Sequence, residues 1–466
     1  MKNPILSAIA IASLAACAAT PREPQIPPHG VIGVSEAQLD PEFWIRHGSS
    51  TSRLVLDEAA IEAQNAKLKQ LDRSVHDVER LPRTLSSTEV LAWVEKMSER
   101  PDDTLYDEHG RAIEASVIDA LVANVNAAAI PATQQTRFGM VVRRSNLRTF
   151  PTDMRVFSEP DDGTDIDRFQ EDALFAGTPL AIVHESRDHQ WWFVVSPLYA
   201  AWIAKRDVAE GTGDEVFAYT HKEPYVVVTG ARAHTVFTPD RPEVSELPLE
   251  MGQRVPLLSD WPAEKPVNGQ HPYTSYVVEL PMRAENGSLH FTPALLQKTN
   301  DVAADYLPLT RANLIRQSFK FLGERYGWGH SYNARDCSGF VSEVYRSFGV
   351  QLPRNTRDQG VSPAVNRIAF TPDDGHEKRL AVLRDVQVGD LVYIPGHVMM
   401  VIGHDGGEPY VIHDTTGITY RDAEGEITRV HLNGVSVTPL LPLLDGKAQQ
   451  PRVDRIYSIQ RIRNTN

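Results

Sequence analysis

Cysteine is scarce in this sequence of 466 residues, which contains only Cys17 and Cys337. Two cysteines exclude a disulfide-rich scaffold and leave too few thiolates for a zinc site built on cysteine. Basic residues are also in the minority, with 47 lysines and arginines against 61 aspartates and glutamates, so the formal net charge is −14. Because affinity for phosphate backbones comes mainly from basic side chains, this balance argues against a nucleic-acid partner.

The apolar run at the N-terminus is short. Residues 5–14 (ILSAIAIASL) follow the positively charged Lys2. This run is only about half as long as the roughly 20 residues that cross a bilayer. A positive residue followed by a short apolar run predicts an export signal. The signal ends in LAAC at Cys17, which resembles a bacterial lipobox, whose cysteine is lipidated and becomes the first residue of the mature protein. That resemblance implies a lipid anchor, and Ala18 then implies the outer membrane with a periplasm-facing body. A plain cleaved signal with a chance cysteine is the alternative.

The rest of the chain divides by its periodicity. Its length suffices for two to four domains, since one core rarely organises more than about 250–300 residues. Residues 18–35 are rich in proline, which predicts a flexible tether. Residues 36–134 show helical periodicity. Residues 135–215 and 216–298 contain short β-rich runs separated by turn residues, which predicts two small β-barrels.

Helices and strands are mixed in residues 299–466. The run LTRANLIRQSFKFLGERY predicts one helix, and CSGFVSEVYRSFG predicts another that starts at Cys337 and stops near Gly349. Strands follow, with the sequences DLVYIP, HVMMVIGH and PYVIHDTT. The predicted fold class is therefore multidomain α+β, with an N-terminal helical segment, two small barrels and a C-terminal α+β domain.

Cys337 stands at a predicted helix start, where backbone N–H groups favour a thiolate and can hold an oxyanion. His397 begins a strand after a Pro-Gly turn, and His413 lies on the next strand. An antiparallel pair would bring them side by side as a base and its orienting group, the logic of a catalytic triad. His404, seven residues after His397, is expected on the opposite face, toward solvent. The alternative is that Cys337 is only a small residue of the hydrophobic core.

Five motifs in order carry a family resemblance. They are YGWGH (326–330), DCSGFV (336–341), LPRNT (352–356), VGDLVYIPGHVMMVIG (388–403) and VIHDT (411–415). This set resembles the NlpC/p60-type bacterial cell-wall cysteine peptidases, a papain-like family. The resemblance implies that Cys337 is the nucleophile, His397 the base and His413 the third catalytic residue.

The same resemblance implies substrate contacts around the nucleophile. Asp336 and Ser338 match positions that hold acidic and polar groups of the substrate. Thr356 matches a serine or threonine position that contacts substrate. Trp328 either walls the cleft or packs in the core, and Arg335 is expected to be a solvated loop charge.

The order of helices, two SH3-like barrels and an NlpC-type domain resembles the γ-D-glutamyl-L-diamino acid endopeptidase subgroup. In that subgroup the first barrel restricts the cleft and binds the free amine of an L-Ala–D-Glu–diamino acid peptide. By weak alignment, Glu171 and Tyr199 are the candidates for the amine site, with Asp172 a near-equal rival of Glu171. The run YAAWI lacks the usual glycine before Trp202, which leaves the pose of Tyr199 open.

The resemblance thus implies cleavage of the D-γ-glutamyl–diamino acid (diaminopimelate) bond of peptidoglycan stem peptides, in wall turnover or recycling. The lipid anchor would be the only membrane contact. A non-enzymatic wall-binding lipoprotein with a vestigial peptidase domain is one alternative, and a papain-like amidase or acyltransferase on another substrate is a second. The sequence has no zinc spacing, calcium loop or nucleotide-binding glycine loop, so we expect no metal and no cofactor.

Overall fold

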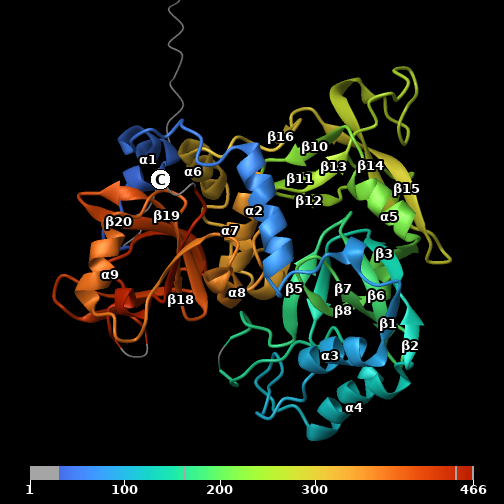
Figure 1. Cartoon of the computed structure of the whole chain (residues 1–466), viewed down its shortest axis with the longest axis horizontal. Helices are drawn as coiled ribbons and strands as arrows, with labels where there is room; N and C mark the ends of the chain where they lie inside the picture. Colours follow the sequence, from blue (N-terminus) through green and yellow to red (C-terminus); the bar gives the residue numbers. More distant parts are fainter. Residues whose placement is uncertain (1–30, 162, 447–448, 464–466) are drawn as a thin grey trace, which may run out of the picture. The chain divides into compact units, whose positions relative to one another are not determined.

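The computed structural model describes residues 31–161, 163–446 and 449–463 (Figure 1). The predicted export signal, Cys17 and the predicted tether up to residue 30 lie outside these ranges. Residues Ile32–Asn466 form one compact unit. Within the described ranges, no helix combines the length and the apolar character that a membrane crossing requires.

The N-terminal segment is mainly helical. Its elements are α1 (Pro41–His47), α2 (Glu58–Leu71), β1 (Thr84–Ser86), α3 (Ser87–Met97), α4 (Ala115–Val125) and β2 (Thr133–Gln135). A capping box starts α3, as the spacing of Ser86 and Glu89 indicates. The backbone N–H of Glu89 donates to Ser86 Oγ at 3.3 Å, and the backbone N–H of Ser86 donates to the Glu89 carboxylate at 2.8 Å. These bonds satisfy two N–H groups at the start of the helix.

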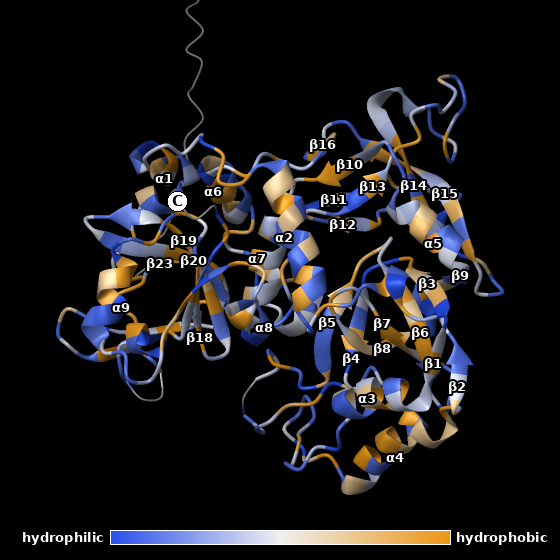
Figure 2. Ribbon diagram, viewed as in Figure 1, coloured by the Kyte–Doolittle hydropathy of each residue, from blue (hydrophilic) through white to orange (hydrophobic). Residues whose placement is uncertain are grey.

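The first β-rich region is one antiparallel sheet in the order β5-β4-β8-β7-β6-β3-β9. Its strands are β3 (Arg137–Val141), β4 (Ser145–Arg148), β5 (Gln170–Leu174), β6 (Pro179–Glu185), β7 (Trp191–Val195), β8 (Ala200–Ala204) and β9 (Val208–Gly211). Along β7, Phe193 and Val195 join the core on one face and Trp192 and Val194 the core on the other, because strand side chains alternate. Hydrophobic residues, in orange, are frequent in the strands of this sheet (Figure 2). Strand β5 is an edge strand, and its free side meets the loop before Cys337.

The second β-rich region follows α5 (Gly213–Thr220) and consists of three small antiparallel sheets, β13-β10-β16, β11-β12 and β14-β15. The strands are β10 (Tyr225–Val228), β11 (Arg232–His234), β12 (Pro248–Glu250), β13 (Arg254–Pro256), β14 (Ser275–Arg283), β15 (Leu289–Gln297) and β16 (Val302–Ala303). The three sheets share one core, to which Val228, Leu249 and Val278 each contribute from a different sheet.

The C-terminal region packs helices on a six-stranded antiparallel sheet in the order β17-β24-β18-β19-β20-β23. Its helices are α6 (Arg311–Phe319), α7 (Cys337–Arg346), α8 (Thr356–Val361) and α9 (His376–Leu383). Its strands are β17 (Asn366–Ala369), β18 (Leu391–Ile394), β19 (His397–Asp405), β20 (Glu408–Thr415), β23 (Gly434–Pro439) and β24 (Ser458–Arg461), with the hairpin β21 (Ile418–Arg421) and β22 (Ile427–Val430) beside it. Helix α6 ends earlier than its sequence predicts, and the chain then turns through Gly323, whose φ is +82°.

The N-terminal segment contributes side chains to two different cores. Trp44 and Ile61 pack in the core that contains Phe340 of α7. Val90 and Ile118 pack in a core of the first sheet. The segment thus packs against the first sheet and against the C-terminal region. The predicted domain boundaries stay predictions.

Candidate active site

Cys337 is the first residue of α7, and its side chain is 5% exposed. The side chain of Asp336 caps the helix, because its Oδ1 accepts a hydrogen bond from the Gly339 N–H at 2.8 Å. Helix α7 packs against β19, and Cys337 and Val398 lie in the same hydrophobic core. Val398 directly follows His397, so the nucleophile candidate packs one residue along β19 from the base candidate.

His397 and His413 are side by side on the neighbouring strands β19 and β20. His397 Nε2 lies 2.8 Å from His413 Nδ1, and His413 Nε2 lies 3.0 Å from Thr438 Oγ1. A chain of donors fits these contacts if His397 donates to His413 and His413 donates to Thr438. That assignment leaves Nδ1 of His397 as the basic nitrogen.

His404 takes no part in this pair. Its Nε2 lies 3.3 Å from the Leu383 carbonyl oxygen at the end of α9, and its side chain is partly buried. The prediction that it faces solvent was wrong, because a β-bulge between Val401 and Gly403 shifts the alternation of β19.

Burial controls the protonation of Cys337 and His397. It raises the pKa of the Cys337 thiol to about 12, and the Asp336 carboxylate adds to the rise. Burial also lowers the pKa of His397 to about 3, with the Arg452 cation acting in the same direction. The predicted thiolate is therefore wrong for the free protein, since desolvation outweighs the helix dipole. Thiol and imidazole are both neutral at pH 7.

Asp414 is a buried acid beside this site that sequence reasoning missed. Neither of its carboxylate oxygens has a hydrogen-bond partner among the described residues. Burial raises the pKa of Asp414 well above its usual range, and the carboxylate of Asp336 adds to the rise. Its charge in turn bears on the pKa of Cys337. The only signal in the sequence is its place next to His413.

Strand β5 of the first sheet touches the loop that precedes Cys337. The indole N–H of Trp328 donates to the Gln170 carbonyl at 3.0 Å, and the side-chain amide of Gln170 donates to the Gly329 carbonyl at 2.7 Å. The N–H of Gly329 donates to Asp336 Oδ2 at 3.0 Å. Trp328 thus stands between the first sheet and the cap of α7.

Arg354 also connects the first sheet to the start of α7, through buried contacts. Its guanidinium donates to Asp172 Oδ1 at 2.5 Å, to Asp336 Oδ2 at 2.8 Å and to Ser338 Oγ at 2.8 Å. All four side chains are buried. Arg354 belongs to the LPRNT motif, but nothing in that motif indicates that its partner comes from β5. Thr356, two residues later, starts α8 and is partly exposed.

Glu171 and Tyr199 contact each other. The Tyr199 hydroxyl donates to Glu171 Oε2 at 2.5 Å, and the Thr149 hydroxyl donates to Glu171 Oε1 at 2.8 Å. Both residues are partly exposed, and burial together with Glu171 raises the pKa of Tyr199. Asp172 differs from Glu171, because it is buried and bound to Arg354.

Arg335 is not the solvated charge that the sequence suggested. Its side chain is 0% exposed and forms ion pairs with Glu250, Glu324 and Glu343. Three carboxylates offset the cost of burying one cation. Glu250 comes from β12, so this arginine also connects the second β-rich region to the loop before α7.

The described residues do not include a candidate metal site. Among them, no group of three or more histidine, cysteine, aspartate or glutamate side chains is arranged to hold an ion.

A helix headed by a buried cysteine, packed on an antiparallel sheet that carries two paired histidines, defines a papain-like α+β fold. More particularly, residues 323–437 match the NlpC/P60 family, and residues 155–204 match the SH3 domain of the SH3b1 type. The chain therefore carries an NlpC/P60 domain and an SH3b domain, as the sequence motifs predicted.

Two curated relatives match parts of the chain. The gamma-D-glutamyl-L-lysine dipeptidyl-peptidase of Bacillus cereus (strain ATCC 10987 / NRS 248) is 28% identical over 222 residues, which cover 46% of this chain and 52% of that protein. The bifunctional muramidase/DL-endopeptidase CwlT of Bacillus subtilis (strain 168) is 27% identical over 129 residues, which cover 26% of this chain and 34% of that protein. The chain thus spans about half and about a third of the length of these relatives.

A solved structure resembles nearly the whole chain. The NlpC/P60 endopeptidase from Photobacterium damselae subsp. piscicida matches with a TM-score of 0.71 and 16% identity, covering 90% of this chain and 96% of that one. At this identity the likeness concerns the fold alone. The predicted fold class, helices with SH3-like barrels and a papain-like domain, is confirmed.

Proposed function

We propose that this protein is a cysteine endopeptidase that cleaves the D-γ-glutamyl–diamino acid bond of peptidoglycan stem peptides, in wall turnover or recycling. The observation that carries the proposal is the position of Cys337 at the start of α7, packed against β19, whose first residue His397 lies 2.8 Å from His413 on β20. The names of the two Bacillus relatives, a gamma-D-glutamyl-L-lysine dipeptidyl-peptidase and a DL-endopeptidase, support the class of bond.

In the proposed mechanism, Nδ1 of His397 takes the proton of Cys337 as the sulfur attacks the γ-glutamyl carbonyl carbon. Because both groups are neutral at rest, proton transfer and attack are coupled. Backbone N–H groups at the start of α7 stabilise the oxyanion. His397 then donates the proton to the leaving amine of the diamino acid, and a thioester remains on Cys337. Water activated by His397 hydrolyses the thioester and restores the thiol.

We assign the free amine of an N-terminal L-Ala to Glu171, with Tyr199 beside it. The Glu171 carboxylate is partly exposed and held in place by two hydroxyl donors. Asp172 is a poorer candidate, because its carboxylate is already bound to Arg354 in a buried ion pair. An ammonium on Glu171 would fix the peptide N-terminus at a set distance from Cys337, which favours short stem peptides with an unblocked L-Ala.

Incubation with L-Ala-γ-D-Glu-diaminopimelate tests the proposal. We expect release of free diaminopimelate, detected by mass spectrometry, from the wild-type protein and none from Cys337→Ala or His397→Ala. The same peptide with an acetylated N-terminus should be a poor substrate. Absence of release by the wild-type protein at every pH from 5 to 9 would refute this substrate.

The burial of Cys337 favours a second candidate, a wall-binding protein whose peptidase domain is vestigial. A thiol that is 5% exposed and has a raised pKa should react slowly in the free protein. Rapid acid quenching during incubation with the peptide distinguishes a peptidase from a wall-binding protein, because only a peptidase forms a thioester on Cys337. Transfer of the acyl group to an added amine instead of water would indicate an acyltransferase.

We further propose that Cys17 is lipidated and that the protein acts in the periplasm from the outer membrane. The LAAC run supports this, and Cys17 lies outside the described residues. Labelled palmitate should appear in the wild-type protein and not in Cys17→Ala. Lack of label in the wild-type protein would favour a plain cleaved signal.

A further inference from the structure

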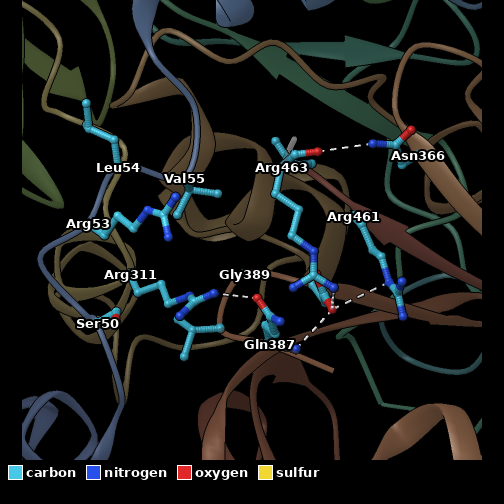
Figure 3. Close-up of a pocket in the computed structure, with 13 residues that line it drawn as sticks. Ser50, Arg53, Leu54, Val55, Arg311, Asn366, Gln387, Gly389, Arg461 and Arg463 are labelled. Carbon is cyan, nitrogen blue, oxygen red and sulfur yellow. Dashed lines mark hydrogen bonds and ion pairs between the residues drawn. The ribbon is translucent and has the colours of Figure 1, made fainter. Parts of the chain in front are cut away.

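A cavity between the N-terminal segment and the C-terminal region is lined by arginines (Figure 3). Its volume is 390 Å³, within the ~300–1,000 Å³ range of small-molecule sites. Arg53 comes from the segment between α1 and α2, Arg311 starts α6, and Arg461 and Arg463 lie at the end of β24 and just beyond it. None of the residues that line this cavity belongs to the candidate active site.

The cavity wall has an excess of positive charge. Asp390 is the only acidic residue among its lining residues, so one carboxylate faces four guanidinium groups. Arg463 donates to Asp390 Oδ2 at 3.0 Å, whereas Arg461 Nε stays 3.9 Å from it. Burial lowers the pKa of Arg463, the Asp390 carboxylate opposes this effect, and the neighbouring cations of Arg461 and Arg311 lower the pKa further. The arginines therefore repel one another across a space that the chain leaves open.

Two of these guanidinium donors lack an acceptor within the part of the chain that the structure describes. Arg461 Nε and Arg463 Nη1 are buried from solvent and have no hydrogen-bond acceptor among the described residues. Arg311 donates to the side chain of Gln387 and to the Ser49 carbonyl, so it is held in position at the cavity wall. A buried donor without an acceptor is rare in a folded protein and calls for a ligand that supplies one.

A ligand suited to these donors would be an anion with several acceptor oxygens. Guanidinium forks match the oxygens of phosphate and of carboxylate. The excess of three positive charges favours a phosphate dianion over a single carboxylate. A general basic surface does not explain the cluster, because the whole chain has a net charge of −14. The cavity also has polar side chains, Asn366 and Gln387, and more room than one ion fills.

We propose that this cavity binds the phosphate group of a phosphomonoester, either a soluble molecule or a lipid head group. Arg461 and Arg463 would donate to its oxygens from the buried side. Arg53, which is exposed, would close over it from the open side. The site is separate from peptide cleavage and does not depend on the proposed function.

Titration calorimetry of the full chain with inorganic phosphate and with glycerol 3-phosphate, at constant ionic strength, tests the site. We expect both ligands to bind the wild-type protein and the Cys337→Ser variant equally. Arg53→Gln, a change at an exposed side chain that leaves the fold intact, should weaken binding about tenfold or more. Arg187→Gln, at an exposed arginine in the turn between β6 and β7, is the matched control and should bind like wild type. Lack of binding by both ligands, or equal weakening in the two arginine variants, would overturn the proposal.

Cosedimentation with vesicles distinguishes the two sources of phosphate. Phosphatidic acid vesicles that capture wild type better than Arg53→Gln, with no difference on phosphatidylcholine, assign the site to a lipid head group. Equal capture of the two proteins assigns it to soluble phosphomonoesters, provided that calorimetry shows binding. The comparison of two proteins that differ only at residue 53 removes any contribution of a lipid anchor.

Discussion

Arg354 donates a hydrogen bond of 2.5 Å to Asp172, a residue 182 positions away on strand β5. Because Arg354 also binds Asp336, the cap of α7, the SH3b sheet is connected directly to the helix that carries Cys337. The neighbouring residues Glu171 and Asp172 thus make different contacts. Asp172 is buried and bound to Arg354, whereas Glu171 is partly exposed and is the residue proposed to bind the substrate amine.

Asp172→Asn should destabilise the protein by ~3–5 kcal/mol, because it leaves Arg354 buried with one fewer carboxylate. Urea unfolding measures this change. Asp119→Asn is the control, since Asp119 forms an exposed ion pair with Arg100 at 2.9 Å and should cost less than ~1 kcal/mol. Equal losses in the two variants would show that the buried pair does not hold the domains together.

Glu171→Gln should raise the KM for a peptide with a free L-Ala amine about 10- to 100-fold with little change in kcat, because it removes a charge-assisted bond made equally in the ground and transition states. Steady-state kinetics with the free and the N-acetylated peptide measure the effect. The acetylated peptide, which has no ammonium, should distinguish wild type from variant by much less. A similar loss on both peptides would remove Glu171 from the amine site.

His413→Ala should lower kcat by ~10²–10⁴, because His397 loses the acceptor that orients its ring and fixes its tautomer. His413→Asn retains an acceptor oxygen and should recover part of the rate. Kinetics of both variants, alongside their thermal midpoints, separate orientation from a loss of folding. An Ala variant that folds and keeps the wild-type kcat would contradict a role for His413.

Alkylation of Cys337 by iodoacetamide should be slower at pH 7 than alkylation of an ordinary cysteine, because burial raises the pKa of this thiol to about 12. Only the thiolate reacts, so the rate should rise about tenfold per pH unit between pH 7 and 9. Mass spectrometry of the peptide that contains Cys337 gives the rate, and urea-unfolded protein supplies the reference. Fast, pH-independent labelling of the native protein would indicate a resting thiolate.

Asp414→Asn should gain stability relative to wild type as the pH rises. The unfolded chain loses the Asp414 proton near pH ~3.9, whereas the folded chain retains it, since its folded pKa is raised. Wild-type stability therefore falls above that pH by up to ~1.4 kcal/mol per unit until the folded pKa is reached. Urea unfolding at pH 4, 5, 6 and 7 measures the difference, with Asp119→Asn as control. Parallel curves for Asp414→Asn and wild type would contradict a raised pKa.

The sequence predicted the features that are local or follow a contiguous motif. The helix at Cys337, the strands of His397 and His413 and the cap of α3 depend on residues a few positions apart. The pairing of Arg335 with Glu250, 85 positions away, could not be predicted, because periodicity carries no information about which distant carboxylate will neutralise a buried cation. The thiolate prediction failed for a related reason, since helix position is visible in a sequence and depth of burial is not.

Trp44 and Ile61 fill part of the core beneath α7, although they precede it by more than 250 positions. A recombinant piece cut at residue 299 would lack both and would have a void where an indole and an aliphatic side chain belong. The C-terminal region is consequently not an independent folding unit. A fusion of this region to another targeting domain must also include the N-terminal helices that complete its core.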